Sequence, residues 1–359
     1  MDKAAIIVLA DTETHGELGR LVNALSTADE FREHGDEVTI IFDGAGVRWA
    51  AELSNATNTQ AVAFNYGLYL GSRYKNRPNI IWIAGGDYSV PAGSELETRE
   101  HKILEGIKAA GSTQLFTGLW NSDHVSTDQA AFAADMDLDS AYEYTVTYPD
   151  ALAAYQHTPP RPALLFETGY EAEGWSPGDP TSVRAYEYDG ELSAIGGTVY
   201  GHRDIWAFTS ATWSAGYPFG SQRWQLSLGA PGAQDMTRMR ALFDAVAWWN
   251  LVPAGTAGMR RLVTAGGGTN GTADYATAAA APDGSTLVAY VPSTSAATRT
   301  VTVDLSVMSG PVRSRWYNPT SGAYVVISAS SPNTAGSLFT TPGDNGTGAR
   351  DWVLVIDRV

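Results

Sequence analysis

Short apolar segments alternate with segments of helical spacing between residues 4 and 249, and this alternation is the strongest constraint on the fold. After residue 60, strands are predicted at 79–84, 114–119, 142–148, 162–167 and 197–200. Helices are predicted at 60–75, 96–110, 127–135, 150–156, 182–194 and 235–249. Strands that alternate with helices in this way form a parallel sheet, so we expect an α/β fold, open or closed into a barrel.

The first 60 residues form a β-α-β unit of their own. Strands are predicted at 4–10 and 37–43, and a helix at 17–34 ends at Gly35. With this unit the chain has seven candidate parallel strands, whereas a closed (β/α)8 barrel has eight. These residues are also strongly acidic, with eleven Asp and Glu against four Lys and Arg. That shift in charge indicates a segment of different origin from the rest.

From about residue 258 the pattern changes to short β-rich segments separated by Gly, Ser, Thr, Asn and Asp turns. Examples are TLVAYVP, TVTVDLS and WVLVIDR, and the pairs DG at 283–284 and SG at 321–322 are typical of hairpin turns. These features predict a small β-sandwich that follows the α/β region.

Composition excludes several function classes. The net charge of −16 disfavours a nucleic-acid backbone or an anionic membrane as partner. The chain has no Cys, so disulfides, thiol nucleophiles and zinc ribbons are excluded. The apolar run at 4–10 is short and reads as a first strand rather than a signal peptide, and no run is long enough to span a membrane. As written, the N-terminus is that of a cytoplasmic protein.

Polar side chains that follow the predicted strands are the candidate functional residues, because function gathers at the carboxyl ends of parallel strands. Asp87 and Glu167 stand out, since each closely follows an apolar strand. A pair of carboxylic acids across a barrel mouth is the device of glycoside hydrolysis, in which one acid protonates the leaving oxygen and the other attacks the sugar. The candidates for sugar contact are Trp120, Asn121, His124, Tyr170, Glu171, Tyr200, His202 and Trp206.

Structural readings of the same residues remain open. Asp87 is as well explained by capping of the following loop, and Glu167 by an ion pair with Arg184 or Arg203. Most of the 11 Trp and 17 Tyr are expected in the core. The histidines lack the spacing of a metal site and no G-x-S-x-G elbow is present, so neither a metal, a cofactor nor a serine triad is predicted.

Four segments resemble the apiosidase-like glycoside hydrolases of family 140. They are GSRYKNRPNIIWIAGGD (71–87), RPALLFETGYE (161–171), GGTVYGHRDIW (196–206) and LGAPGAQDMTRMRALFDAVAWWNLVP (228–253). The resemblance covers about residues 60–359 and implies a (β/α)8 barrel followed by a collagen-binding-like β-domain. It also implies that Asp87 is the acid/base and Glu167 the nucleophile of a retaining enzyme. Relatives of the barrel part are usually exported.

The front of the chain departs from that family. The family's first-strand motif contains a Trp that floors the sugar site, and residues 1–55 instead resemble the start of a DsrE-like protein. We therefore expect three parts: a DsrE-like β-α-β segment (1–56), a glycoside hydrolase barrel incomplete or rebuilt at its N-terminal strands (57–255), and a β-sandwich (256–359). The expected function is retaining hydrolysis of a plant- or microbe-derived oligo- or polysaccharide. The alternative is a non-catalytic carbohydrate- or matrix-binding protein on a degenerate barrel.

Overall fold

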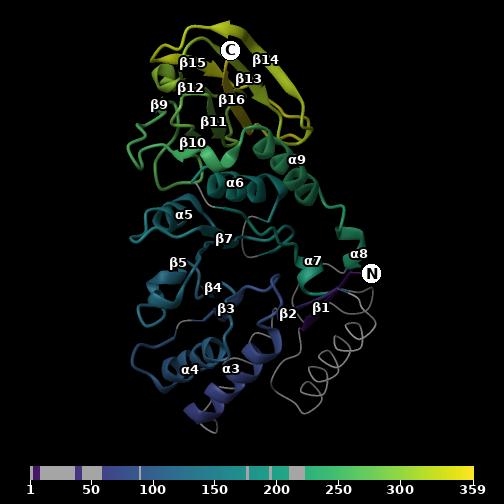
Figure 1. The fold of residues 1–359 in the computed structure, drawn as a ribbon. Coiled ribbons are helices and arrows are strands. Elements are labelled where there is room, and N and C mark those ends of the chain that lie inside the picture. The colour runs from purple at the N-terminus through teal and green to yellow at the C-terminus, as the bar shows by residue number, and fades with distance from the viewer. Residues whose placement is uncertain are drawn as a thin grey trace. The chain divides into compact units, whose positions relative to one another are not determined.

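The computed structural model describes residues 3–8, 37–42, 59–88, 90–174, 178–193, 196–209 and 223–359, the first two ranges as backbone only. Contact clustering divides the chain into two compact units (Figure 1). Unit 1 comprises residues 1–121 and 126–137, and unit 2 comprises residues 122–125 and 138–359. The predicted helix at 17–34 lies outside the described residues.

Unit 1 contains two pairs of parallel strands and two packed helices. Strand β1 pairs with β2, and β3 pairs with β4, each in parallel register. The strands and α-helices among its described residues are β1 (Lys3–Val8), β2 (Glu37–Phe42), α3 (Gln60–Tyr74), β3 (Trp82–Gly85), α4 (Glu95–Ala109) and β4 (Phe116–Leu119). All six agree with elements that the sequence predicts.

The two helices of unit 1 begin at side-chain caps and pack closely. Thr59 caps α3, and Ser94 caps α4 by accepting the backbone N–H of Glu97 at 3.1 Å. The Glu97 carboxylate in turn accepts a hydrogen bond from the N–H of Gly93, which completes a reciprocal cap of the helix start. Gly67 of α3 lies against the backbone of Ile103, so a side chain there would separate the helices.

The helix predicted at 127–135 is wrong. Two 3₁₀ turns, Ser126–Asp128 and Ala133–Asp135, stand in its place. Tertiary bonds explain the difference: Phe132 inserts beside Trp120, and Asp137 exchanges bonds with the backbone of Phe116. Lys108 and His101 also hold the carboxylate of Asp135. These anchors draw the chain back toward β4, and a continuous helix would break them.

Unit 2 begins with a three-stranded sheet in the order β5-β6-β7. Its strands are β5 (His124–Val125), β6 (Asp139–Tyr142) and β7 (Ala163–Glu167). The sequence placed the middle strand at 142–148, which is about three residues too late, and it missed β5. Residues 147–155 instead lead into α5 (Tyr148–Tyr155), with Pro149 in its first turn. Instead of a full strand at 197–200, Thr198 forms a single parallel bridge with Leu165.

Helices α6 (Pro180–Glu191) and α9 (Pro231–Ala245) lead to the β-domain, with the short α7 (Arg203–Trp206) and α8 (Trp224–Ser227) between them. The β-domain holds a six-stranded sheet, β14-β13-β16-β11-β10-β8, and a three-stranded sheet, β15-β12-β9. Their strands are β8 (Val252–Pro253), β9 (Val263–Ala265), β10 (Thr277–Ala280), β11 (Thr286–Val291), β12 (Thr300–Val303), β13 (Val312–Tyr317), β14 (Tyr324–Ser331), β15 (Ser337–Thr340) and β16 (Trp352–Arg358). The two predicted hairpin turns join β10 to β11 and β13 to β14, as expected.

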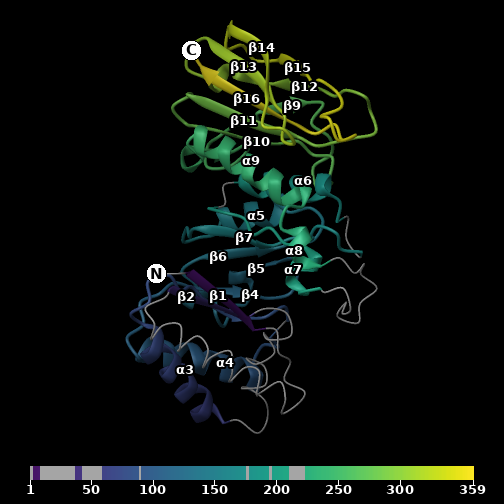
Figure 2. The ribbon, with the colours of Figure 1, turned by 90° about the vertical axis from the view of Figure 1, so that its right-hand side faces the viewer.

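The six-stranded sheet is covered on both faces, with α6 and α9 against one of them (Figures 1 and 2). On β11, Leu287 and Ala289 belong to the core shared with the three-stranded sheet. The alternate residues Val288 and Tyr290 pack instead with Tyr188 of α6 and with α9. Two apolar faces explain why strands such as TLVAYV and WVLVI carry almost no polar residues. Within the described residues, no helix is both long enough and apolar enough to cross a bilayer.

Candidate functional site

Asp87 lies on an unusual turn that directly follows β3. Gly85, Gly86 and Asp87 all have positive φ values, of 79°, 150° and 58°. The N–H groups of Gly86 and Asp87 both donate to the carbonyl of Leu119 at the end of β4, at 2.8 and 3.3 Å. The side chain of Asp87 is exposed. Non-glycine residues with a left-handed backbone conformation are uncommon in proteins. Those that occur are concentrated at functional sites.

Trp120 and Asn121 follow β4 in the same unit. The Trp120 ring is 1% exposed, packs against Phe132, and donates its indole N–H to the carbonyl of Ser126 at 2.8 Å. Such a ring offers no face to a sugar, so Trp120 acts here as a core residue and we leave it out of the proposed site. Asn121 is exposed.

Glu167 ends β7, and a β-bulge sets the direction of its side chain. Ala141 of β6 pairs with Leu165, but the next residue, Tyr142, pairs with Glu167, so Phe166 is the extra residue. Leu165 faces the small core shared with α5. Without the bulge the alternation would place Glu167 on that apolar face; with it, the carboxylate lies beside Tyr142 on the other face.

Tyr142, the last residue of β6, and Tyr144 form a chain of hydrogen bonds that ends at the Glu167 carboxylate. The Tyr144 hydroxyl donates to Glu167 Oε1 at 3.3 Å, and it is hydrogen-bonded in turn to the Tyr142 hydroxyl. Arg184 binds Asp235 and Asp351, and Arg203 binds Asp204. Arg184, one of the two arginines proposed as ion-pair partners for Glu167, is thus bound by two other carboxylates.

Asp123 and Glu143 form a carboxyl pair that the sequence analysis missed. His124 and Tyr142 are partners in the antiparallel β5-β6 pair, so Asp123 and Glu143 are the next residues to face each other. Thr145 donates its N–H and its hydroxyl to Glu143 Oε1 at 2.6 and 2.7 Å. Burial and then the hydrogen bond with Asp123 raise the pKa of Glu143. Burial and the neighbouring Asp123 thus favour the protonated form of Glu143.

Glu171 and Tyr200 cap a helix. Helix α9 starts at Ala230 and Pro231, which provide no side-chain cap. The Glu171 carboxylate fills this role by accepting the N–H of Gly232 at 3.0 Å, and the Tyr200 hydroxyl donates to the same oxygen. Burial raises the pKa of Glu171, and these two bonds oppose the rise. The sequence assigned both residues to sugar contact, but the structure gives their polar groups a structural role.

Tyr170 and the two histidines are fixed by local contacts. The half-buried Tyr170 ring lies against Gly201, where a Cβ would overlap it. His202 is 6% exposed, and its Nδ1 accepts the N–H of Asp204 at the start of α7; burial lowers its pKa. His124 is only partly buried and donates from Nδ1 to the carbonyl of Ser122 at 2.9 Å, which leaves its Nε2 as an acceptor. Within the described residues, no three metal-ligating side chains gather.

Trp206 is half-buried and is tied to Glu173, a residue that the sequence analysis did not select. Its indole N–H donates to Glu173 Oε1 at 3.1 Å. Glu173 is 7% exposed. Burial raises its pKa to about 7, and the bonds from Trp206 and Tyr170 and the charge of Arg203 only partly oppose this.

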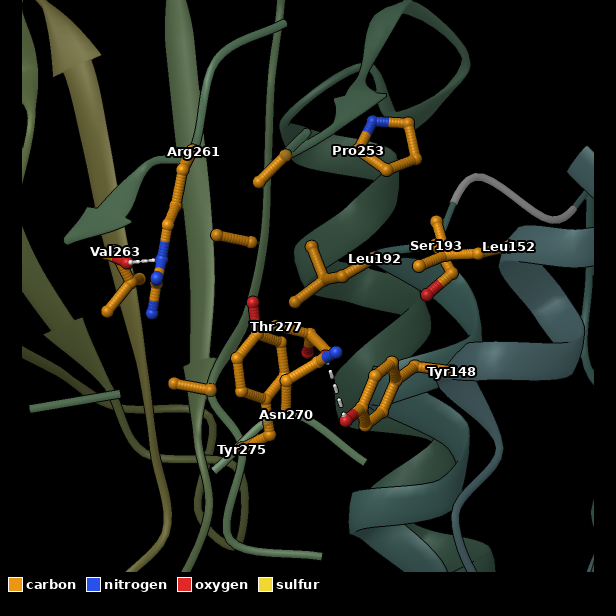
Figure 3. A pocket seen from close by; sticks show the side chains of 13 residues that line it. Tyr148, Leu152, Leu192, Ser193, Pro253, Arg261, Val263, Asn270, Tyr275 and Thr277 are labelled. Carbon is orange, nitrogen blue, oxygen red and sulfur yellow. Dashed lines mark hydrogen bonds between the residues drawn. The ribbon is translucent and has the colours of Figure 1, made fainter. Parts of the chain in front are cut away.

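A small pocket of about 130 Å³ lies where α5 and the end of α6 meet the β-domain (Figure 3). Tyr148 and Tyr275 stack there with ring centroids 5.1 Å apart, and the Tyr148 hydroxyl donates to Asn270. The glycine-rich segment 266–271 forms one wall as a loop between β9 and β10. Thr277 and Arg261 donate to Asp189 and to the carbonyl of Val263. The bonds of Tyr148 with Asn270 and of Thr277 with Asp189 join the β-domain to the helices.

Comparison with known proteins places these residues in a family. The model described as "Apiosidase-like, catalytic domain" matches residues 38–250 and includes both Asp87 and Glu167. The chain belongs to the apiosidase-like glycoside hydrolases. Residues 264–357 match the family "Putative collagen-binding domain of a collagenase". The apiosidase-like match begins at 38, inside the segment compared with DsrE-like proteins, and nothing in the comparisons supports that second resemblance.

Solved structures show the same fold. A structure named "Glycoside hydrolase" has 18% identity and a TM-score of 0.73, and the match covers 99% of this chain and 85% of that one. A family 5 glycoside hydrolase from Bacteroides vulgatus has 22% identity and a TM-score of 0.73, with coverage of 97% and 76%. A search of curated proteins found no match. The apiosidase-like chain therefore has a barrel of glycoside hydrolase type followed by an all-β domain.

Proposed function

We propose that this apiosidase-like protein hydrolyses a plant- or microbe-derived glycan by double displacement. Glu167 is the nucleophile that attacks the anomeric carbon. Asp87 protonates the leaving oxygen and then takes a proton from the water that releases the sugar. The observation that carries the proposal is the bulge before Glu167, which turns a carboxylate out of the helix-packed face into contact with Tyr144.

The placement of the other residues supports separate roles. Tyr144 orients the nucleophile, so that one carboxylate oxygen is directed at the sugar. The Asp87 side chain is exposed on a left-handed turn, as a side chain that donates a proton to a leaving group has to be. Asn121, His124, Tyr170 and Trp206 remain as candidates for contact with the saccharide, since each is at least partly exposed.

The first experiment is hydrolysis of pectin-derived oligosaccharides by the full chain, its Asp87→Asn and Glu167→Gln variants, and Glu95→Gln, an exposed residue of α4, as control. We expect each of the first two changes to lower kcat by a factor on the order of 10³ or more, with unchanged thermal unfolding. Proton NMR of the first product should show retention of the anomeric configuration. Full activity in either variant, or inversion, would contradict the assignment. If wild type binds the glycan but does not hydrolyse it, the proposed hydrolase function is wrong and the protein is a carbohydrate-binding protein.

A further inference from the structure

We propose that Glu173 is the positioning residue of Trp206, and that it holds the indole ring as a platform on which a sugar ring of the glycan stacks. This inference rests on the proposed function for its substrate class, and on the contacts around Glu173 for its geometry. It assigns a role to a buried carboxyl that the hydrolytic mechanism does not use.

The backbone brings the two residues together. Glu171 forms a parallel bridge with His202, in which Glu171 accepts the N–H of Arg203 and donates to Gly201, both at 3.0 Å. Glu173 lies two residues beyond this bridge on one segment and Trp206 four residues beyond it on the other. The bridge thus sets the alignment of the two segments that carry Glu173 and Trp206.

Each partner is also fixed locally. The N–H of Ala172, which has a φ of 67°, bonds to Gly178, and the N–H of Glu173 bonds to the carbonyl of Tyr170. On the other segment the N–H of Trp206 bonds to His202, which caps α7. Neither side chain depends on the other for its backbone position, so the indole–carboxyl bond selects the orientation of the ring.

The burial of the pair is asymmetric. Glu173 is almost fully buried and its Oε2 has no hydrogen-bond partner, whereas Trp206 is only half-buried. A buried carboxyl with one oxygen left without a hydrogen bond contributes little to stability, because the cost of its desolvation is not offset. A fixed indole edge with part of the ring exposed suits the apolar face of a sugar. Among the described residues, the charge that acts on Glu173 is that of Arg203, which is itself held by Asp204.

The test follows the indole ¹⁵N–¹H signal of Trp206, assigned by its loss in Trp206→Phe. In wild type this signal should shift with pH with a midpoint near 7, as Glu173 ionises. Glu173→Gln retains an acceptor but should abolish the titration, and Glu173→Leu should also displace the signal. Glu95→Gln should behave as wild type. A signal that does not titrate in wild type, or that titrates unchanged in Glu173→Gln, overturns the proposal.

The platform itself is tested with the pectin-derived oligosaccharide that wild type cleaves best. Glu173→Leu should raise KM about tenfold, which corresponds to about 1.4 kcal/mol of binding free energy, while Glu173→Gln stays near wild type. An unchanged KM in Glu173→Leu overturns the stacking role. If wild type cleaves none of the pectin-derived oligosaccharides, the proposed function fails. The binding affinities of these oligosaccharides for wild type and for Glu173→Leu are then compared in place of KM. The indole titration decides the contact in either case.

Discussion

Three glutamates within one short segment have three different environments. Glu167 lies beside tyrosine hydroxyls, Glu171 caps a helix that begins sixty residues later in the chain, and Glu173 is nearly buried with Trp206 bound to one of its oxygens. The residue type and the position near a strand end are the same in each case. Their environments differ because each meets a different distant segment, and it is the environment that decides what a carboxylate can do.

The cap on α9 gives a prediction at Gly232. A Cβ at this position would overlap Glu171 Oε2 and displace the carboxylate from the helix start. We expect Gly232→Ala to lower the free energy of unfolding by about 1–3 kcal/mol in urea, from the loss of a buried hydrogen bond. Gly229→Ala is the matched control, since a Cβ there meets nothing within 4 Å. Equal stability of the two variants would contradict the capping role.

The Asp123–Glu143 pair predicts a pH effect. The folded pKa of Glu143 is raised above its ordinary value of 4.5, so protonation favours the folded state and stability is lost as pH rises through the raised pKa. In Asp123→Asn the amide can donate to an ionised Glu143, so the loss of stability above pH 4.5 should be smaller. Urea unfolding between pH 4 and 8 measures this, with Asp244→Asn as the exposed control. Parallel curves for wild type and Asp123→Asn would show that Asp123 does not raise the pKa of Glu143.

Sequence patterns selected some of these residues and did not select others. Asp87 and Glu167 could be selected because each follows an apolar strand and lies in a family motif. Glu171 was assigned to sugar contact because its partner, the N–H of Gly232, is remote in sequence. Asp123 and Glu143 were missed because β5 is only two residues long, and without β5 no pattern shows that they face each other.

At the scale of elements, helices were predicted correctly where the apolar periodicity was long and a capping residue preceded it. Helices α3 and α4 start at the Thr and Ser caps that precede their apolar pattern. The segment 127–135 is rich in Ala and Asp and reads as helix, but tertiary bonds of Phe132 and Asp135 prevail over that propensity. Strand β6 was placed too late because EYTVT has the β-branched composition of a strand, while DSAY does not.

Helices α6 and α9 and the loop before β16 are joined by one buried arginine. Arg184 binds Asp235 and Asp351 at 2.7 and 2.9 Å, with all three side chains almost fully buried. Arg184→Leu leaves the buried Asp351 without its cation and leaves Asp235 with Arg238 alone, so we expect a loss of about 3–5 kcal/mol of unfolding free energy. Arg240→Leu removes an exposed pair with Asp244 and should cost less than about 1 kcal/mol. Similar unfolding midpoints for the two variants would show that Arg184 does not join these elements.

At the scale of the whole molecule, the β-domain is part of the packing of unit 2. Tyr188 of α6 stacks on Tyr290 of β11 with centroids 4.8 Å apart, and Thr277 of β10 donates to Asp189 of α6. One face of the six-stranded sheet would be a bare apolar surface without α6 and α9. Composition predicted a sandwich correctly, but it could not show that a third layer of helices covers the sheet.

Buried acids make the stability of unit 2 depend on pH. Burial raises the pKa of Asp189 from 3.8 to about 8, and those of Glu187 and Glu191 from 4.5 to about 7. Each group is protonated more readily in the folded state, so its contribution is present at low pH and is lost as pH rises from about 4 to 8. Calorimetry should show a lower unfolding temperature at pH 8 than at pH 5. Asp189→Asn should reduce that difference, and an unchanged difference would contradict the burial of an ionisable Asp189.

The strand order of the six-stranded sheet also governs when the molecule can be assembled. Strand β16 lies between β13 and β11, yet it is synthesised after every other strand of the β-domain. Until residues 351–358 have left the ribosome, the two halves of that sheet have no strand to join them, and Arg184 lacks Asp351. Nascent chains therefore carry unpaired strand edges until β16 emerges, and exposed edges of this kind favour aggregation.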